Sequence, residues 1–376
     1  MQSKLLVAVF FGGMSSEHEV SQRSAANILR HLSPTRCQPY QIGITKEGDW
    51  FLFPGTADEI EDGSWVRHPE NRPVVLSANR SCPGLLVLEN NCYTFLKVDL
   101  LFPVLHGKNG EDGSIQGLFT LSGIPYVGCD ILSSAVCMDK AVTHSLLSSV
   151  YGVEMTNYLW FYRERYRSAP EKIKDKIEAR LRFPVFVKPA KGGSSVGVSR
   201  VTEKEALDAA IAKAALEDEK IIVENAIQGR ELECAVLGNQ DPSVSGVGEI
   251  ITDAEFYDYQ DKYISGTARC VIPAALPETL SREIQQAALR AYRHLGCSGL
   301  ARVDFFLTEE GQVILNEINT LPGFTAISMY PQLWQAAGLD YASLLDRIMD
   351  HALACSDPLA SPASLPDSAG ETGDRL

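Results

Sequence analysis

A β-hairpin pattern late in the chain carries two carboxylates and an amide. Residues 301–307 and 312–318 are largely apolar and are joined by a short polar turn. Asp304 lies on the first expected strand, Glu317 and Asn319 lie two residues apart on the second, and the turn places Asp304 roughly opposite Glu317. Oxygen ligands that converge in this way suit Mg²⁺. The alternative interpretation, a solvated cross-strand face, is disfavoured by the apolar neighbours.

Arg302 adds a positive charge to this cluster. It stands two residues before Asp304 and therefore shares its face of the strand. A guanidinium beside a metal and its carboxylates can steady a phosphate or a developing oxyanion. The alternative is that Arg302 only balances the charge of the carboxylates.

A glycine-rich loop, KPAKGGSSVG at residues 188–197, follows a short apolar strand. Its backbone N–H groups, hydroxyls and lysines are what a phosphate clamp needs. Neither GxxxxGK[ST] nor GxGxxG occurs in the chain, so the loop is not one of those two nucleotide-binding motifs. The alternative is an ordinary surface loop, because glycine, proline and serine are also typical of turns without a binding function. The strand residue Lys188, like Lys140 upstream, could also be an ordinary surface charge.

Three further positions could contribute to a site. Glu17 lies between the first expected strand and the helix that follows it. The alternative is that its negative charge only stabilises the N-terminus of that helix. His106 opens a glycine-rich turn and could simply hydrogen-bond within it. Residues 255–265 hold three tyrosines in a polar stretch, which is typical of a lid that orders over a ligand.

In the first third of the chain, strand and helix patterns alternate, and these elements position Glu17 and His106. We expect strands at 5–11, 38–44 and 98–104 and helices at about 20–32 and 114–122. This alternation predicts an α/β fold with an open parallel sheet, whose ligands bind at the carboxyl ends of the strands.

The rest of the chain divides into further units. We predict a first domain over residues 1–128, a second over 129–225, a third over 226–355 with a mobile lid at about 249–266, and a disordered tail over 356–376. The second unit holds a charged stretch at 164–182 that we interpret as a solvated helix.

Composition limits the classes of partner. The chain has 376 residues, 34 Lys and Arg against 48 Asp and Glu, and a formal charge of −14. This argues against nucleic acid or an anionic membrane surface as a partner, because both require a dense positive field. No window approaches the roughly 20 apolar residues of a membrane span. Nine cysteines without a CxxC pair indicate reduced thiols in a cytoplasmic protein.

Seven stretches together resemble one family, the D-alanine:D-alanine ligases of the ATP-grasp superfamily, in their longer bacterial A-type form. They are GGMSSEHEVS, HGKNGEDGSIQG, CMDK, VKPAKGGSSVG, IIVENAIQGRELECAVLG, EFYDYQDKYISG and ARVDFFL with NEINTLPGFTAISMYP. The similarity spans residues 5 to 353. It implies a Rossmann-like N-terminal domain followed by a two-part ATP-grasp fold, and a cytoplasmic homodimer that uses ATP and D-alanine to make a cell-wall dipeptide.

The resemblance also implies roles for residues at matching positions. Glu17, Ser194 and Tyr263 would form a triad that organises the substrates, with His106 near the first D-alanine, while Arg302 and the backbone of Gly323 would stabilise the oxyanion. The second D-alanine would meet Ser328, Met329 and Lys262. The implied ATP contacts are Lys140, Lys188, Ser194, Ser195, Glu224, Asn225, Ile227, Glu231, Lys262 and Asn316. Asp304, Glu317 and Asn319 would bind two Mg²⁺, or Mn²⁺ in their place, with Glu317 bridging.

Several alternatives remain open at this stage. A depsipeptide ligase that joins D-alanine to D-lactate differs at the lid tyrosine, so Tyr263 favours the dipeptide product. Another ATP-grasp carboxylate–amine ligase is disfavoured by the full set of seven stretches. An NAD-dependent oxidoreductase lacks its glycine fingerprint, and a non-catalytic nucleotide-binding module leaves the Asp304, Glu317 and Asn319 cluster without a purpose.

Overall fold

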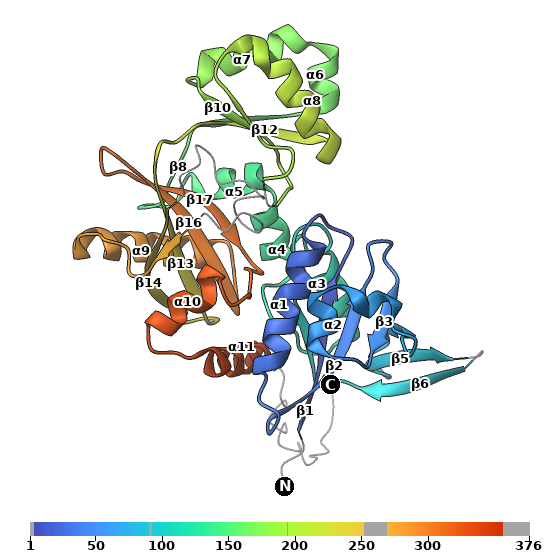
Figure 1. Ribbon diagram of the computed structural model, residues 1–376. Coiled ribbons are helices and arrows are strands. Elements are labelled where there is room, and N and C mark those ends of the chain that lie inside the picture. Colours follow the sequence, from blue (N-terminus) through green and yellow to red (C-terminus); the bar gives the residue numbers. More distant parts are fainter. Residues whose placement is uncertain (1–3, 90–91, 194, 252–268, 356–376) are drawn as a thin grey trace, which may run out of the picture.

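The computed structural model describes residues 4–89, 92–193, 195–251 and 269–355 (Figure 1). Within these ranges the strands form three sheets of seven, four and six strands. The predicted tail at 356–376 lies outside the described residues. No helix within the described ranges is long and apolar enough to cross a membrane.

The seven-stranded sheet has the order β6-β5-β4-β3-β2-β1-β7. Its strands are β1 (Leu5–Gly12), β2 (Cys37–Ile44), β3 (Trp50–Phe53), β4 (Arg72–Leu76), β5 (Gly84–Glu89), β6 (Cys92–Lys97) and β7 (Leu100–Pro103). β1 pairs in parallel with β2 and β7, as predicted. The other neighbouring pairs are antiparallel, so the sheet is mixed: the predicted parallel pairing holds for the three predicted strands and does not extend to β3, β4, β5 and β6. Antiparallel neighbours need only short connections, and the chain between β2 and β6 supplies them.

Helices α1 (His18–His31) and α3 (Ser114–Ser122) follow β1 and β7, with the short α2 (Ala57–Glu61) and a 3₁₀ turn at Ser64–Arg67 between β3 and β4. The observed α3 has the predicted bounds. Gly12 makes the turn into α1: its φ is +87°, and a Cβ there would lie 2.2 Å from the backbone oxygen of Ile44. Only glycine fits such a position.

The four-stranded antiparallel sheet forms the top of the molecule in Figure 1. Its order is β11 (Ser199–Val201), β10 (Val185–Pro189), β12 (Lys220–Asn225) and β9 (Tyr158–Tyr162), and its helices are α6 (Arg163–Ser168), α7 (Pro170–Arg180) and α8 (Leu207–Glu217), the last preceded by a 3₁₀ turn at Lys204–Ala206. The charged stretch is therefore two helices rather than one, because Pro170 occupies the first turn of α7. It is not fully solvated either, since Ile173 and Ile177 are buried in the core under this sheet.

The six-stranded sheet has the order β15-β14-β13-β16-β17-β8. Its strands are β8 (Glu154–Met155), β13 (Gly229–Leu237), β14 (Ser243–Ile251), β15 (Arg269–Val271), β16 (Leu300–Thr308) and β17 (Val313–Asn319). Its associated helices are α4 (Ile131–Met138), α5 (Lys140–Leu147), α9 (Glu278–His294), α10 (Met329–Ala336) and α11 (Tyr341–Cys355). Although we assigned residues 129–155 to the second unit by sequence, Cys129, Cys137, Leu147 and Val153 pack in the core of this sheet. The domain limits themselves stay a prediction.

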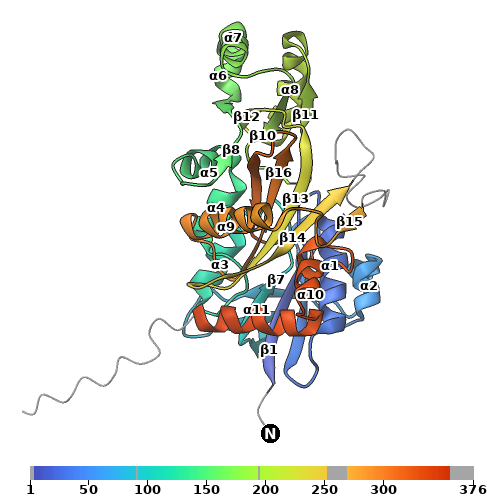
Figure 2. The same ribbon diagram turned by 90° about the vertical axis from the view of Figure 1, so that its left-hand side faces the viewer.

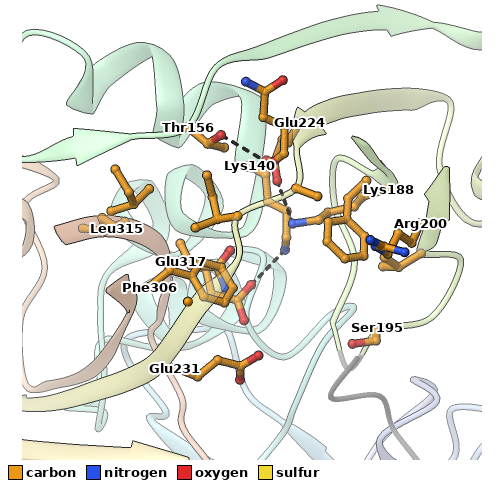
Figure 3. Close-up of a pocket in the computed structure, with 18 of the residues that line it drawn as sticks. Lys140, Thr156, Lys188, Ser195, Arg200, Glu224, Glu231, Phe306, Leu315 and Glu317 are labelled. Atoms are coloured by element: carbon orange, nitrogen blue, oxygen red, sulfur yellow. Dashed lines mark hydrogen bonds and ion pairs between the residues drawn. The ribbon is translucent and has the colours of Figure 1, made fainter. Parts of the chain in front are cut away.

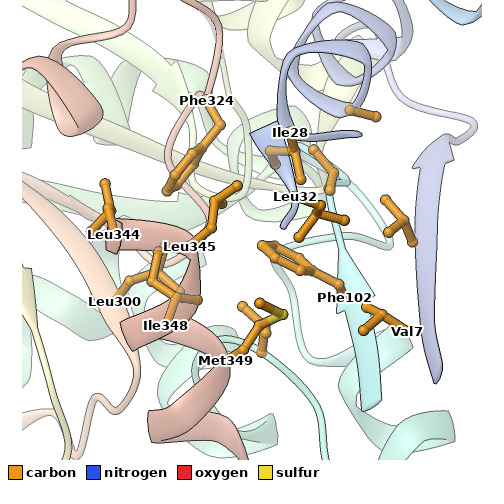
Figure 4. Packing of buried hydrophobic residues seen from close by; sticks show 14 of the residues in the cluster. Val7, Ile28, Leu32, Phe102, Leu300, Phe324, Leu344, Leu345, Ile348 and Met349 are labelled. Atoms are coloured by element: carbon orange, nitrogen blue, oxygen red, sulfur yellow. The ribbon is translucent and has the colours of Figure 1, made fainter. Parts of the chain in front are cut away.

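One hydrophobic core joins the seven-stranded sheet to the six-stranded one (Figure 4). Phe102 and Ile28 from the first sheet and its helix α1 meet Leu345 and Met349 of α11, which lies along the base of the molecule in Figure 2. Each such buried side chain contributes roughly 1.5–3 kcal/mol. The shared core therefore fixes the position of the N-terminal loops relative to the β16–β17 hairpin.

Candidate active site

Two connected pockets lie between the three sheets. The first has a volume of about 630 Å³ and opens between the four-stranded and six-stranded sheets. The second, of about 820 Å³, lies between the six-stranded sheet and the loops of the N-terminal sheet. Both are lined by Lys140, Gly192, Gly193, Ile250 and Glu317. The two pockets therefore adjoin at these residues, with Lys140 and Glu317 as the shared charged side chains.

The predicted hairpin carries the cluster at this junction. β16 and β17 pair with Asp304 opposite Glu317 and Arg302 opposite Asn319, which confirms the register expected from the sequence. Arg302 donates from Nε and Nη2 to the two carboxylate oxygens of Asp304, and both distances are 2.7 Å. Asn319 Nδ2 also donates to Asp304 Oδ2 at 2.9 Å. The four side chains thus share one face of the hairpin.

Lys140 bridges the hairpin and the glycine-rich loop. Its Nζ lies 3.2 Å from Glu317 Oε2 and donates to the backbone oxygen of Gly192 at 3.0 Å. Burial alone would lower the pKa of Lys140, but the charge and hydrogen bond of Glu317, together with the charges of Glu224 and Glu111, outweigh the effect of burial, so the pKa is raised and the side chain is a cation. The N-terminus of α5 places it there, because Asp139 caps that helix and accepts from Val142 N.

The far end of the first pocket holds Lys188 and Glu224 on the neighbouring strands β10 and β12 (Figure 3). Lys188 Nζ donates to Glu224 Oε2 at 2.6 Å, and His144 Nε2 lies 3.0 Å from Glu224 Oε1. Burial would raise the pKa of Glu224. The charges of Lys188 and His144 and their hydrogen bonds outweigh the effect of burial, so the pKa is strongly lowered. Glu224 is therefore a carboxylate despite its burial.

The remaining predicted ATP contacts within the described residues also line the first pocket. They are Ser195, Asn225, Ile227, Glu231 and Asn316. Apolar side chains complete the wall, among them Phe186, Phe306 and Leu315. Apolar walls with one lysine at the junction and another at the far end suit a flat aromatic base joined to an anionic chain.

Glu17 lies in the second pocket and is 7% exposed. It occupies the N-cap position of α1, yet its side chain makes no cap hydrogen bond. Its carboxylate instead packs against two glycines, since a Cβ at Gly107 or Gly193 would come within 2.5 Å of Glu17 Oε2. The charge of Glu17 at the start of α1 is compatible with the helix-start alternative, and its place in the second pocket is compatible with the predicted site role.

His106 lies beside Glu17 in the second pocket. Its Nδ1 is 3.0 Å from the backbone oxygen of Leu321, which links the N-terminal loop to the segment after β17. Burial lowers the pKa of His106, and the nearby charge of Glu17 only partly offsets this. A neutral imidazole held in place is the form that this environment favours.

Gly323, Ser328 and Met329 line the opposite wall of the second pocket. Ser328 Oγ accepts from the backbone N–H of Thr325 at 3.0 Å and lies 2.8 Å from Thr325 Oγ1. A Cβ at Gly323 would come 3.0 Å from Ser328 Oγ, so glycine is what lets the backbone approach that hydroxyl. Met329 is buried at the start of α10.

Three acidic or basic residues of the site escaped the sequence analysis. Glu111 lies in the second pocket within the quoted stretch HGKNGEDG, and its Oε2 accepts from Gly107 N at 2.7 Å. Burial raises its pKa to about 8, with the charge of Glu17 adding to the effect. Glu233 on β13 stands opposite Asp304, and its Oε2 is 2.9 Å from Arg302 Nε. His144 is the third. Glu111 and Glu233 both lie within stretches quoted for the resemblance, so a local signal existed for them, whereas His144 lies outside every quoted stretch.

Ser194, Lys262 and Tyr263 lie outside the described residues, as does most of the expected lid, residues 252–266 of 249–266. Their roles therefore stay as the resemblance implies them.

The predicted metal ligands have the right donor chemistry for Mg²⁺. Asp304, Glu317 and Asn319 offer two carboxylates and an amide oxygen, all hard oxygen donors. Arg302 and Lys140 currently pair with those carboxylates, so a cation must join or displace these ion pairs. In the part of the chain that is described, no group of three or more His, Cys, Asp or Glu side chains could hold a metal ion. The fit therefore depends on the Asn319 amide as the third donor.

Comparison with known families identifies the family of this chain. A model of the D-ala D-ala ligase N-terminus matches residues 6–129, and a model of the D-ala D-ala ligase C-terminus matches residues 147–350. The chain belongs to the D-alanine–D-alanine ligase family. The resemblance drawn from the seven sequence stretches is thereby confirmed.

Relatives in this family are similar over nearly their whole length. The D-alanine–D-alanine ligase of Acetivibrio thermocellus is 47% identical over 367 residues, covering 94% of this chain and 97% of the relative. That of Caldicellulosiruptor bescii is 45% identical over 352 residues, covering 93% and 96%. The chain is therefore an enzyme, and specifically a ligase of an ATP-using family.

Solved structures of related ligases have the same fold. The crystal structure of VanG D-Ala:D-Ser ligase from Enterococcus faecalis superposes with a TM-score of 0.85 at 42% identity, covering 93% of this chain and all of that one. The D-alanine-D-alanine ligase from Coxiella burnetii gives a TM-score of 0.82 at 35% identity, covering 94% and 95%. The predicted α/β class with a two-part ATP-grasp fold is confirmed.

Proposed function

We propose that this ligase joins two D-alanines to D-alanyl-D-alanine with ATP, through a D-alanyl phosphate, as a step in making peptidoglycan precursors. One observation carries the proposal: a pocket suited to a nucleotide and a pocket suited to amino acids meet at Lys140 and Glu317. The proposal is supported by the names of the relatives that match over nearly their whole length. This arrangement would bring the terminal phosphate of a nucleotide and the carboxylate of an amino acid to the same junction.

The first pocket would hold ATP. Its apolar walls would enclose the base, with Glu224 and the backbone of Asn225 at the adenine edge, Ile227 against the ring and Glu231 at the ribose. Asn316 and Ser195 would complete the lining, and the cationic Lys140 and Lys188 would meet the phosphates. Lys262 and Ser194 are assigned to phosphates through the resemblance alone.

The second pocket would hold the two D-alanines. The buried carboxylate of Glu17 would bind the first ammonium group, with neutral His106 beside it and with Ser194 and Tyr263 completing the triad. Ser328, Met329 and Lys262 would receive the second D-alanine. Water exclusion here would protect an acyl phosphate from hydrolysis.

Two displacements would complete the reaction. A carboxylate oxygen of the first D-alanine would attack the terminal phosphorus of ATP, and the bond to the leaving ADP would break. The amine nitrogen of the second D-alanine, after losing a proton, would then attack the acyl carbon and expel phosphate. Arg302 and the backbone N–H of Gly323 would stabilise the oxyanion of the tetrahedral intermediate.

Asp304, Glu317 and Asn319 would hold Mg²⁺, or Mn²⁺ in its place, at the junction of the pockets. When bound, two such ions would neutralise the phosphate oxygens that gain charge during transfer. We also propose, from the resemblance, a homodimer located in the cytoplasm. D-alanine and ATP are the proposed partners, without nucleic acid or membrane.

The identity of the second substrate is the sharpest test. The assay measures ADP and phosphate release, with products separated by chromatography, for D-alanine alone and with D-serine, D-lactate or L-alanine added. We expect D-alanyl-D-alanine as the main product at pH 7.5 and no stimulation by L-alanine. A mixed D-alanyl-D-serine or ester product as the main species would overturn the assignment and leave only the carboxylate-activating half of the proposal.

A further inference from the structure

His144 forms a buried contact with the nucleotide pocket that no role above uses. It lies on α5, one turn beyond Lys140, and is 2% exposed. Its ring packs on Tyr158 with centroids 4.4 Å apart. Its Nε2 is 3.0 Å from Glu224 Oε1, and His144 itself lines the first pocket.

The geometry fixes which proton the imidazole carries. Nδ1 is buried and makes no hydrogen bond to any of the residues that the structure describes. Nε2 faces a carboxylate, which can only accept, so Nε2 must bear the hydrogen. His144 is therefore a donor to Glu224 through Nε2.

Glu224 consequently has one donor on each oxygen. His144 holds Oε1, and Lys188 holds Oε2 at 2.6 Å. Glu224 is 4% exposed, so water offers little replacement for either donor. Without His144 the carboxylate would lose the donor on Oε1 and would be held by Lys188 alone.

We propose that His144 is a positioning residue for ATP binding, which acts by holding the Glu224 carboxylate so that Glu224 and Lys188 keep the geometry that the nucleotide needs. This inference rests on the proposed use of the first pocket for ATP. It assigns His144 no contact with D-alanine and no part in either displacement.

Two substitutions separate hydrogen bonding from packing. His144→Leu keeps an apolar side chain of similar bulk against Tyr158 but removes the donor. His144→Gln keeps an N–H that can reach Glu224. Binding of Mg²⁺ with adenylyl imidodiphosphate is measured by calorimetry, and KM and kcat are measured in the ADP-release assay.

We expect His144→Leu to weaken binding of the ATP analogue and raise KM for ATP by about tenfold or more. kcat at saturating ATP and KM for D-alanine should stay within about twofold, and His144→Gln should recover most of the affinity. Leu146→Ala, at an exposed position on the same helix, controls for helix stability and should match the parent.

Parental affinity in His144→Leu, or equal loss in the Leu and Gln variants, would overturn the inference. If His144→Leu does not fold, His144→Asn replaces it: the same amide on a shorter side chain should not rescue binding, and rescue equal to that of Gln would contradict the role. Failure of the parent to bind the analogue would instead overturn the proposed function itself, and the inference with it.

Discussion

Arg302 and Asp304, two residues apart on β16, form a two-point ion pair in which both N–O distances are 2.7 Å. A third partner, Glu233, comes from the neighbouring strand β13, with its Oε2 2.9 Å from Arg302 Nε. The guanidinium thus balances two mostly buried carboxylates while it lines the second pocket. Charge balance and oxyanion stabilisation are therefore compatible roles for the same side chain.

Removing this cation should destabilise the fold as well as stop the reaction. Arg302→Met leaves two buried carboxylates without their partner, and we expect the free energy of unfolding to fall by about 3 kcal/mol. Adding Glu233→Gln to Arg302→Met should restore part of that loss without restoring turnover. Urea unfolding and the ADP-release assay check the two effects separately. Equal stability of the single and double variants would show that Glu233 is not a significant partner of Arg302.

Glu317→Gln should nearly abolish turnover while the protein stays folded. The change removes a charge from the proposed metal bridge and from the contact with Lys140, but the hairpin remains paired. We expect kcat to fall by about 10² or more, the order seen when one stabilising group is lost from a transition state. Glu309→Gln removes the same charge from the exposed turn of this hairpin and serves as the control. Mg²⁺-dependent turnover within threefold of the parent would contradict the metal assignment.

Local patterns predicted the hairpin register, because strand alternation and turn length fix which residues share a face. They could not predict that Glu233 joins Arg302, since those residues are brought together by pairing between strands distant in sequence. The antiparallel strands between residues 50 and 97 were also missed, in part because β6 is exposed along nearly its whole length, so its apolar residues do not mark a buried face. In the charged stretch, Ile173 and Ile177 are four residues apart and therefore lie on one face of the helix. Because most of the neighbouring residues are charged, the sequence did not indicate that this face is buried.

The pH dependence of stability should reveal Glu111. Its pKa is about 8 in the folded protein against about 4.3 when unfolded, so the folded state binds the extra proton between these values. The stability that this proton provides is fully present below about pH 4 and is lost as the pH rises toward 8. Unfolding free energies of the parent should therefore fall over this window, by up to about 1.4 kcal/mol per pH unit.

Glu111→Gln should remove this slope, because an amide cannot ionise and its oxygen can still accept from Gly107 N. Urea unfolding at pH 5, 6, 7 and 8 should show that the free energy of unfolding of the variant, relative to that of the parent, increases as the pH rises. For Glu309→Gln the free energy of unfolding should change with pH in the same way as that of the parent. If Glu111→Gln is also parallel, Glu111 is ionised in the folded protein at neutral pH and its burial does not govern its titration.

Ser328→Ala tests the wall of the second pocket that we assign to the second D-alanine. Two effects must be separated, because Ser328 Oγ both faces the pocket and closes a turn by accepting from Thr325 N. Loss of a hydrogen bond to the substrate carboxylate should raise KM for D-alanine by about tenfold or more and leave binding of an ATP analogue within twofold of the parent.

Thr325→Val is the matched control, since it removes the 2.8 Å contact between the two hydroxyls but keeps the Ser328 hydroxyl itself. If the turn alone mattered, Thr325→Val would impair the enzyme as much as Ser328→Ala, and Ser328 would then act by shaping the loop rather than by binding substrate. A rise in KM for D-alanine confined to Ser328→Ala, with ATP binding intact, would place the second substrate in this pocket and separate its site from that of the nucleotide.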